Sequence, residues 1–120
     1  MIKKYVDENG RYIEIGSKYN DSYSISDIIK HIDEDIKKAI KDGEIFPFEY
    51  EIRERKLYLV ESQIDFTVLS SSRRLVKDGK VTDDYIFLDN KIQEMIDEYW
   101  TNEHSVDWSK GNFYSNISFE

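Results

Sequence analysis

The sequence ISDIIKHIDEDIKKAIK, residues 25–41, decides the fold class of this chain, because its apolar residues recur at steps of three and four. This spacing places them along one stripe of an α-helix. Ser24 or Ser26 can cap the free amides at its start, and Gly43 is a natural stop. The sequence therefore predicts an amphipathic helix over residues 25–42. Its apolar stripe consists of Ile25, Ile28, Ile29, Ile32, Ile36, Ala39 and Ile40.

Alternating apolar residues on both sides of this helix predict β-strands. Before it, residues 2–15 form two apolar segments around an Asn-Gly pair, which is typical of a tight hairpin turn. After it, residues 46–52 and 64–68 alternate and predict two strands. Phe113, Ile117 and Phe119 predict a last strand near the carboxyl end.

A second helix and two connections complete the expected order. Residues 70–80 predict an exposed loop or short hairpin, and TNEHSVDWSKG, residues 101–111, predicts a connection. The order hairpin-αββαβ indicates an α+β fold with two helices packed on one face of a mainly antiparallel sheet. The second helix is expected over residues 83–101, with an apolar stripe of Tyr85, Leu88, Ile92, Met95, Ile96 and Tyr99.

The 120 residues suffice for one hydrophobic core. We expect a single domain over residues 1–120, in which a hairpin over 1–16 is added to an αββαβ core over 24–120. The chain has no cysteine, which fits a reducing compartment, and it lacks both an apolar run of about 18 residues and a secretory signal. We therefore expect a cytoplasmic protein of a bacterial host cell, without membrane contact.

Acidic residues outnumber basic ones by 25 to 17, so the formal net charge is −8. Almost all of this excess lies in residues 83–120, whose net charge is −7, whereas residues 1–82 carry only −1. Residues 53–80 have a net charge of +3. The charge pattern therefore predicts an acidic carboxy-terminal region beside a basic loop-and-strand edge.

Several segments resemble a known family. They are IIKHIDEDIKKAIKDG, FEYEIRER, SQIDFTVL, EMIDEYW and WSKGNFYSNISFE. Together they make residues 28–119 similar to the large polyvalent protein-associated domain of the twenty-ninth type, which occurs in phage and conjugative-element proteins. The amino-terminal hairpin, the charged loop 70–80 and the segment LYLVES depart from the family pattern. The resemblance implies a mobile-element origin and a binding role, and it supplies no catalytic residues.

Motifs for catalysis or metal binding are missing from the sequence. His31 lies beside the apolar stripe of the first helix, and His104 has Glu103 and Asp107 nearby, but neither histidine sits in a zinc-ligand spacing such as HExxH. There is no glycine-rich phosphate loop, and the serines at 70–72 have no evident base. We therefore expect no enzymatic activity, no metal and no cofactor.

The main functional hypothesis is stoichiometric protein–protein binding. An acidic, aromatic surface would contact a basic cleft of a host protein, most concretely inhibiting a defence nuclease or effector in the manner of an anti-CRISPR protein. The residues expected to bind the partner are Asp89, Glu94, Asp97, Glu98, Trp100, Glu103, Asp107 and Trp108.

Two alternatives use the basic residues instead. An accessory nucleic-acid-binding module would hold phosphates with the basic edge, and its affinity would depend steeply on salt. An anti-defence protein could also capture a nucleotide signal between subunits, with Arg73 and Arg74 on phosphate. The residues expected to bind phosphate are Arg53, Arg55, Arg73, Arg74, Lys77 and Lys80. The oligomeric state is left open by the sequence.

Overall fold

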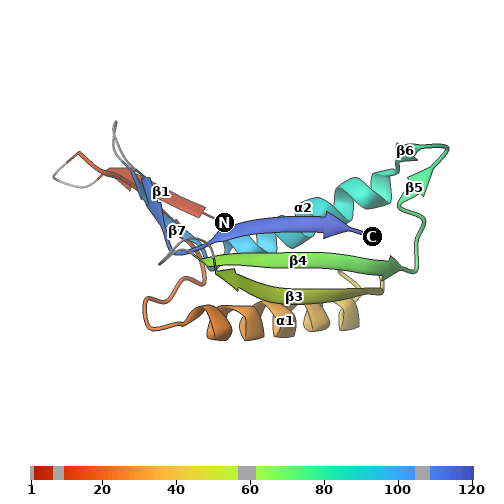
Figure 1. Ribbon diagram of the computed structural model, residues 1–120, viewed down its shortest axis with the longest axis horizontal. Coiled ribbons are helices and arrows are strands. Elements are labelled where there is room, and N and C mark those ends of the chain that lie inside the picture. The colour runs from red at the N-terminus through yellow and green to blue at the C-terminus, as the bar shows by residue number, and fades with distance from the viewer. Residues whose placement is uncertain (1, 7–9, 57–61, 105–108) are drawn as a thin grey trace.

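The computed structural model describes residues 2–6, 10–56, 62–104 and 109–120, and Figure 1 shows the arrangement of the elements. Within these ranges there are two helices and nine strands, and the strands form three sheets, which confirms the α+β class. The elements are β1 (Ile2–Val6), β2 (Tyr12–Gly16), α1 (Ile25–Lys41), β3 (Phe48–Lys56), β4 (Ser62–Ser71), β5 (Val76–Lys77), β6 (Lys80–Val81), α2 (Asp83–Asp97), β7 (Thr101–His104), β8 (Ser109–Gly111) and β9 (Tyr114–Phe119).

The central sheet has the strand order β3-β4-β9, and both helices pack on one of its faces (Figure 1). β4 pairs antiparallel with β3 and parallel with β9. Ile64, Phe66 and Val68 alternate along β4 and are fully buried beneath the helices. On the opposite face, β4 carries the polar residues Gln63, Asp65 and Thr67, which are partly exposed, and neither of the two described helices packs there. This is the predicted arrangement of helices on one face of a mainly antiparallel sheet.

Helix α1 begins and ends as the sequence predicts. The Ser24 hydroxyl accepts a hydrogen bond from the Asp27 amide, and the Asp27 carboxylate accepts one from the Ser24 amide, which forms a capping box. Gly43 follows the helix with a φ of 77°, a left-handed conformation that glycine adopts without strain. The buried stripe of the helix is Ile28, Ile32, Ile36 and Ala39.

Helix α2 is shorter than predicted. Thr82 caps its start, but the helix ends at Asp97, so the predicted extension to residue 101 is wrong. The chain turns at Tyr99 and Trp100 and enters β7 at Thr101, where it pairs with β2. Strand pairing with a distant segment therefore ends the helix. The helical spacing of the sequence gives no sign of this tertiary interaction.

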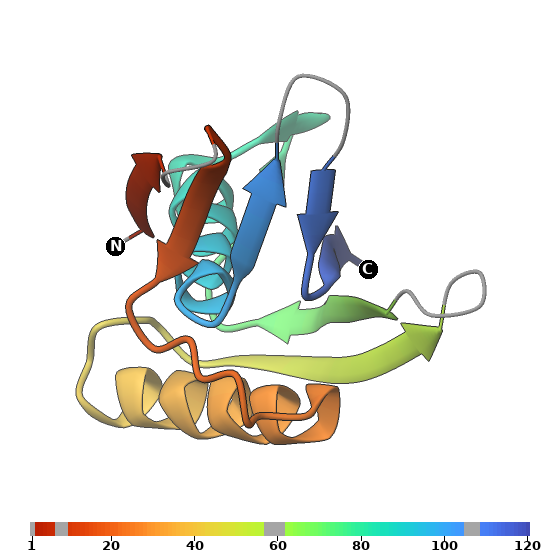
Figure 2. The same cartoon turned by 90° about the vertical axis from the view of Figure 1, so that its left-hand side faces the viewer.

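The predicted connection over residues 101–111 is also wrong, because it contains β7 and β8. These strands join β1 and β2 in a four-stranded antiparallel sheet with the order β1-β2-β7-β8. Figure 2 shows its strands standing across β3 and β4. The segment does not alternate apolar and polar residues, so its extended conformation depends on pairing, of β7 with the distant β2 and of β8 with β7.

The amino-terminal hairpin is confirmed, but it belongs to this second sheet rather than to the central one. The short β5–β6 hairpin is closed by Asp78 and Gly79 at positive φ. It confirms the prediction of a loop or short hairpin for residues 70–80.

Neither helix combines the length and apolar character needed to cross a bilayer, within the part of the chain that is described.

Candidate protein-binding surface

The acidic residues expected to bind a partner lie on different sides of α2. Glu94 is exposed on the solvent side of the helix. Asp89 and Asp97 share the flank of Gln93, whose side chain lies 3.4 Å from Ser115 of β9, and Asp97 accepts a hydrogen bond of 2.9 Å from Gln93. Burial raises the pKa of the Asp97 carboxyl. Glu98 follows the helix on the opposite flank, toward α1. The helix thus separates these carboxylates instead of gathering them on one face.

The remaining members of this set lie at or beyond the end of α2. Trp100 packs against the hydrophobic core and is partly buried. Glu103 pairs with Ile13 in the second sheet, and nothing further is described for its side chain. Asp107 and Trp108 lie outside the described residues. The structure therefore places Asp89, Glu94, Asp97, Glu98 and Trp100 of the predicted surface.

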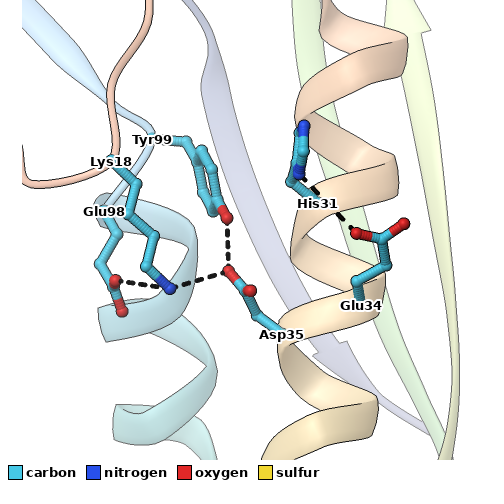
Figure 3. A network of polar contacts seen from close by, with 6 residues as sticks. All are labelled: Lys18, His31, Glu34, Asp35, Glu98 and Tyr99. Atoms are coloured by element: carbon cyan, nitrogen blue, oxygen red, sulfur yellow. Dashed lines mark hydrogen bonds and ion pairs between the residues drawn. The ribbon is translucent and has the colours of Figure 1, made fainter.

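Glu98 belongs to a polar network that the sequence does not reveal (Figure 3). The Lys18 Nζ lies 3.1 Å from Asp35 Oδ2 and 3.2 Å from Glu98 Oε2. The Tyr99 hydroxyl donates a hydrogen bond to the same Asp35 oxygen. These contacts join the β2–α1 connection, α1 and the end of α2. Glu98 is engaged inside the molecule and is a weaker candidate for a partner contact than Glu94.

His31 lies beside this network, with its ring stacked on Tyr23 at a centroid distance of 4.7 Å and 6.1 Å from the ring of Tyr99. Its Nδ1 is 3.8 Å from a Glu34 carboxylate oxygen (Figure 3). It is half-buried at the flank of α1, as the sequence predicts. His104, the second histidine, lies in β7. Within the described residues, no group of three His, Asp or Glu side chains is placed to hold a metal ion.

The network raises two pKa values. Burial and the Asp35 carboxylate hold the pKa of the Tyr99 hydroxyl well above its usual range. Partial burial acts against the Lys18 ammonium, but its hydrogen bonds to Asp35 and Glu98 prevail and raise its pKa. Tyr99 therefore stays protonated at neutral pH and serves as a hydrogen-bond donor.

Replacement of Tyr99 by phenylalanine is expected to lower the free energy of unfolding by about 2 kcal/mol at neutral pH, because the hydrogen bond to a carboxylate is lost. A group whose pKa is raised by folding stabilises the fold below its unfolded pKa and stops doing so as the pH rises through the folded value. The wild-type protein should therefore lose stability above about pH 10, and Tyr99→Phe should lose less. Urea unfolding at several pH values measures both effects. Tyr114→Phe, at an exposed tyrosine, is the control, and an alkaline loss as large in Tyr99→Phe as in the wild type would contradict the assignment.

The basic residues expected to bind phosphate fall into two groups. Arg53 and Arg55 lie on β3, where Arg53 pairs with Glu51 at 3.2 Å and Arg55 with Asp65 at 3.2 Å. The second group lies beyond the other end of the β3–β4 pair, about 20 Å away at 3.3 Å per strand residue. The structure does not bring the two groups together into one patch. The second group consists of Arg73, Arg74, Lys77 and Lys80, all exposed.

The Arg73 guanidinium borders an open hollow of about 610 Å³ between the end of α1 and the start of α2. It lies 5.4 Å from the centre of the Phe46 ring and 3.5 Å from an Asp84 carboxylate oxygen. Phe87 lines the hollow, with its ring centroid 6.2 Å from that of Phe46. Arg73 therefore already has an aromatic ring and a carboxylate as neighbours.

Exposed apolar residues were missed by the sequence reasoning. Val76 and Val81 face each other across the β5–β6 hairpin and are 56% and 52% exposed. Ile86 and Phe87, in the first turns of α2, are 48% and 41% exposed. The signal for the second pair was present in the sequence, since both residues fall outside the apolar stripe of the helix.

Comparison with known protein families, with curated proteins and with solved structures finds no match for this chain.

Proposed function

We propose that the protein acts by stoichiometric binding to another protein, through the solvent side of α2. The observation that carries this proposal is the exposure of two adjacent large apolar side chains, Ile86 and Phe87, with the polar Asn90 and Glu94 on the following turns. An exposed apolar centre with a polar rim is the usual composition of a protein interface. Truncation of a large side chain at such a centre commonly costs most of the affinity.

The charge of the protein supports a basic partner. Residues 83–120 carry a net charge of −7, and Glu94 is exposed two helical turns beyond the apolar pair. An acidic surface speeds association with a positively charged cleft by long-range attraction. We infer that the partner is a defence nuclease or effector of a bacterial host, whose nucleic-acid channel is basic, and that binding inhibits it.

The experiment is affinity isolation of the tagged protein from bacterial cells that contain active defence nucleases, followed by measurement of stoichiometry and nuclease activity. The wild-type protein should form an equimolar complex with a nuclease or effector subunit and inhibit it. Phe87→Asp should weaken that complex about 30-fold or more, because a buried aromatic anchor is worth about 2 kcal/mol. Val6→Asp changes an apolar residue of β1 that is also exposed, at 57% against 41% for Phe87, and is the control. Full nuclease activity at saturating protein, with no equimolar partner, would overturn the proposal.

A further inference from the structure

Strand β9 has a free edge. It pairs with β4 on one side, and in the described part of the chain no strand pairs with its other side. The Glu120 amide donates a hydrogen bond of 2.9 Å to the Val68 carbonyl, so the main-chain groups of Glu120 point toward β4. Successive residues of a strand direct these groups to opposite edges. Ser115, Ile117 and Phe119 therefore present their amides and carbonyls to the free edge.

The two edges of the central sheet differ in how they are protected. Edge strands normally carry charges or proline, which block pairing with other chains. β3, FEYEIRERK, has six charged residues among nine and is protected in this way. β9, YSNISF, has no charged residue, no proline and no glycine. The free edge of β9 is thus competent to pair with an added strand.

An acidic flank of α2 runs beside this free edge. The Gln93 side chain lies 3.4 Å from the Ser115 hydroxyl, and the rings of Tyr85 and Phe119 are 4.2 Å apart. The two contacts show that α2 runs antiparallel to β9, which places Asp89 at the level of Ile117. Asp89, Gln93 and Asp97 recur every four residues, or about 6 Å along a helix. Alternate residues of a strand recur at nearly the same spacing, about 6.6 Å.

We propose that β9 accepts an extended segment of the partner protein as an added strand, and that this segment carries lysine or arginine at alternate positions. The inference rests on the proposed function, because it names the part of the partner that is recognised. The main chain of the segment would bond to Ser115, Ile117 and Phe119. Its basic side chains would face Asp89 and Asp97, and the intervening ones would lie on the open face near Tyr114, which is 52% exposed.

A second copy of this chain is a poorer occupant of the same edge. In antiparallel pairing of β9 with its copy, Ser115, Ile117 and Phe119 of one chain would lie opposite the same three residues of the other. The added strand would then supply no cations, because β9 has no charged residue. It would also bring two acidic flanks of α2 together, and like charges at close range oppose association. Charge complementarity therefore favours a basic segment.

The test uses a ten-residue peptide of alternating lysine and threonine as the probe. A peptide of the same composition in two blocks and a peptide of alternating glutamate and threonine are controls. Binding is followed by NMR and by amide hydrogen exchange of the intact protein. The alternating basic peptide should slow exchange at Ser115, Ile117 and Phe119 at least tenfold, and the controls should not. Equal protection by the block peptide would overturn the proposal, because it would show attraction by charge alone.

Matched variants test the same edge. Ser115→Pro removes an amide that points away from β4, a position where an edge strand tolerates proline, whereas Ser115→Ala keeps the amide. The first should weaken peptide binding at least tenfold and the second should not. Asp89→Lys should weaken peptide binding about tenfold, and Asp89→Asn should have an intermediate effect. Because Asp89→Lys changes a residue on the flank of α2 and not the strand, it tests the proposal even if Ser115→Pro does not fold. Unchanged affinity in Asp89→Lys would overturn the proposal.

Two further outcomes separate this inference from the proposed function. If Ser115→Pro folds and binds the isolated partner as tightly as the wild type, while Phe87→Asp does not, the added strand is wrong and the proposed function stands. If no partner is inhibited but the alternating peptide still binds β9, the proposed function fails while the recognition at β9 stands. If the protein dimerises with increasing concentration and Ser115→Pro abolishes the dimer, the occupant of the β9 edge is a second copy of the chain, and the proposal of a basic segment is overturned.

Discussion

Replacement of Phe66 by alanine is expected to lower the free energy of unfolding by about 3–5 kcal/mol, the usual cost of removing a buried phenyl ring. Phe66 is fully buried in the middle of β4. Its ring stacks on that of Tyr50 at 5.1 Å and lies 6.3 Å from that of Phe48. Domains are stable by only about 5–15 kcal/mol, so this variant should lose a large part of its stability.

Urea unfolding followed by tryptophan fluorescence and circular dichroism measures this loss. Thr67→Ala is the matched control, because Thr67 is the next residue on the same strand and lies on the uncovered face of the sheet. It should change the free energy of unfolding by less than about 1 kcal/mol. Equal losses in the two variants would contradict the assignment of the helix-covered face as the core. The α2 surface and β9 depend on this core, so Phe66→Ala should also weaken partner binding.

The central layer of the fold could be predicted from the sequence because its periodicities are local. The stripe from Ile25 to Ile40 has helical spacing, and Ile64, Phe66 and Val68 alternate, so both elements follow from the burial of one face. The end of α2 and the strands β7 and β8 could not be predicted. Thr101 is extended only because β2, some 85 residues earlier, pairs with it, as in the contact of Ile15 with Thr101.

The candidate surface was predictable in part. The acidic character of α2 follows from composition, and a helical projection would have placed Ile86 and Phe87 outside the buried stripe. The free edge of β9 could not be predicted, because the strand order β3-β4-β9 depends on a parallel pairing of segments about 50 residues apart. The engagement of Glu98 by Lys18 is likewise a tertiary contact.

The second sheet is attached to the rest of the molecule in a different way from the central one. Among the described residues, the buried hydrophobic cluster contains no member of β1, β2, β7 or β8. Main-chain hydrogen bonds instead join the end of β2 and the residues after it to the segment that follows α2. They run from the Gly16 amide to the Trp100 carbonyl and from the Lys18 amide to the Glu98 carbonyl, both 2.7 Å. Its stability should therefore depend on the close approach of β2 to the end of α2.

Gly16→Ala is expected to disrupt this attachment, at a cost of about 3 kcal/mol for overpacking at a rigid contact. A Cβ at Gly16 would lie 2.2 Å from the Asp97 carbonyl oxygen and 2.4 Å from that of Glu98, and main-chain atoms cannot move aside as a side chain could. Amide hydrogen exchange should accelerate about 100-fold in β2 and β7, while α1 and β4 keep their protection. Ser17→Ala, at the exposed neighbouring residue, is the control. Equal acceleration in β4 would contradict this expectation, because it would show that both sheets unfold as one unit. If protection is lost only in β2 and β7, then β9 and the solvent side of α2 should still be able to bind a partner.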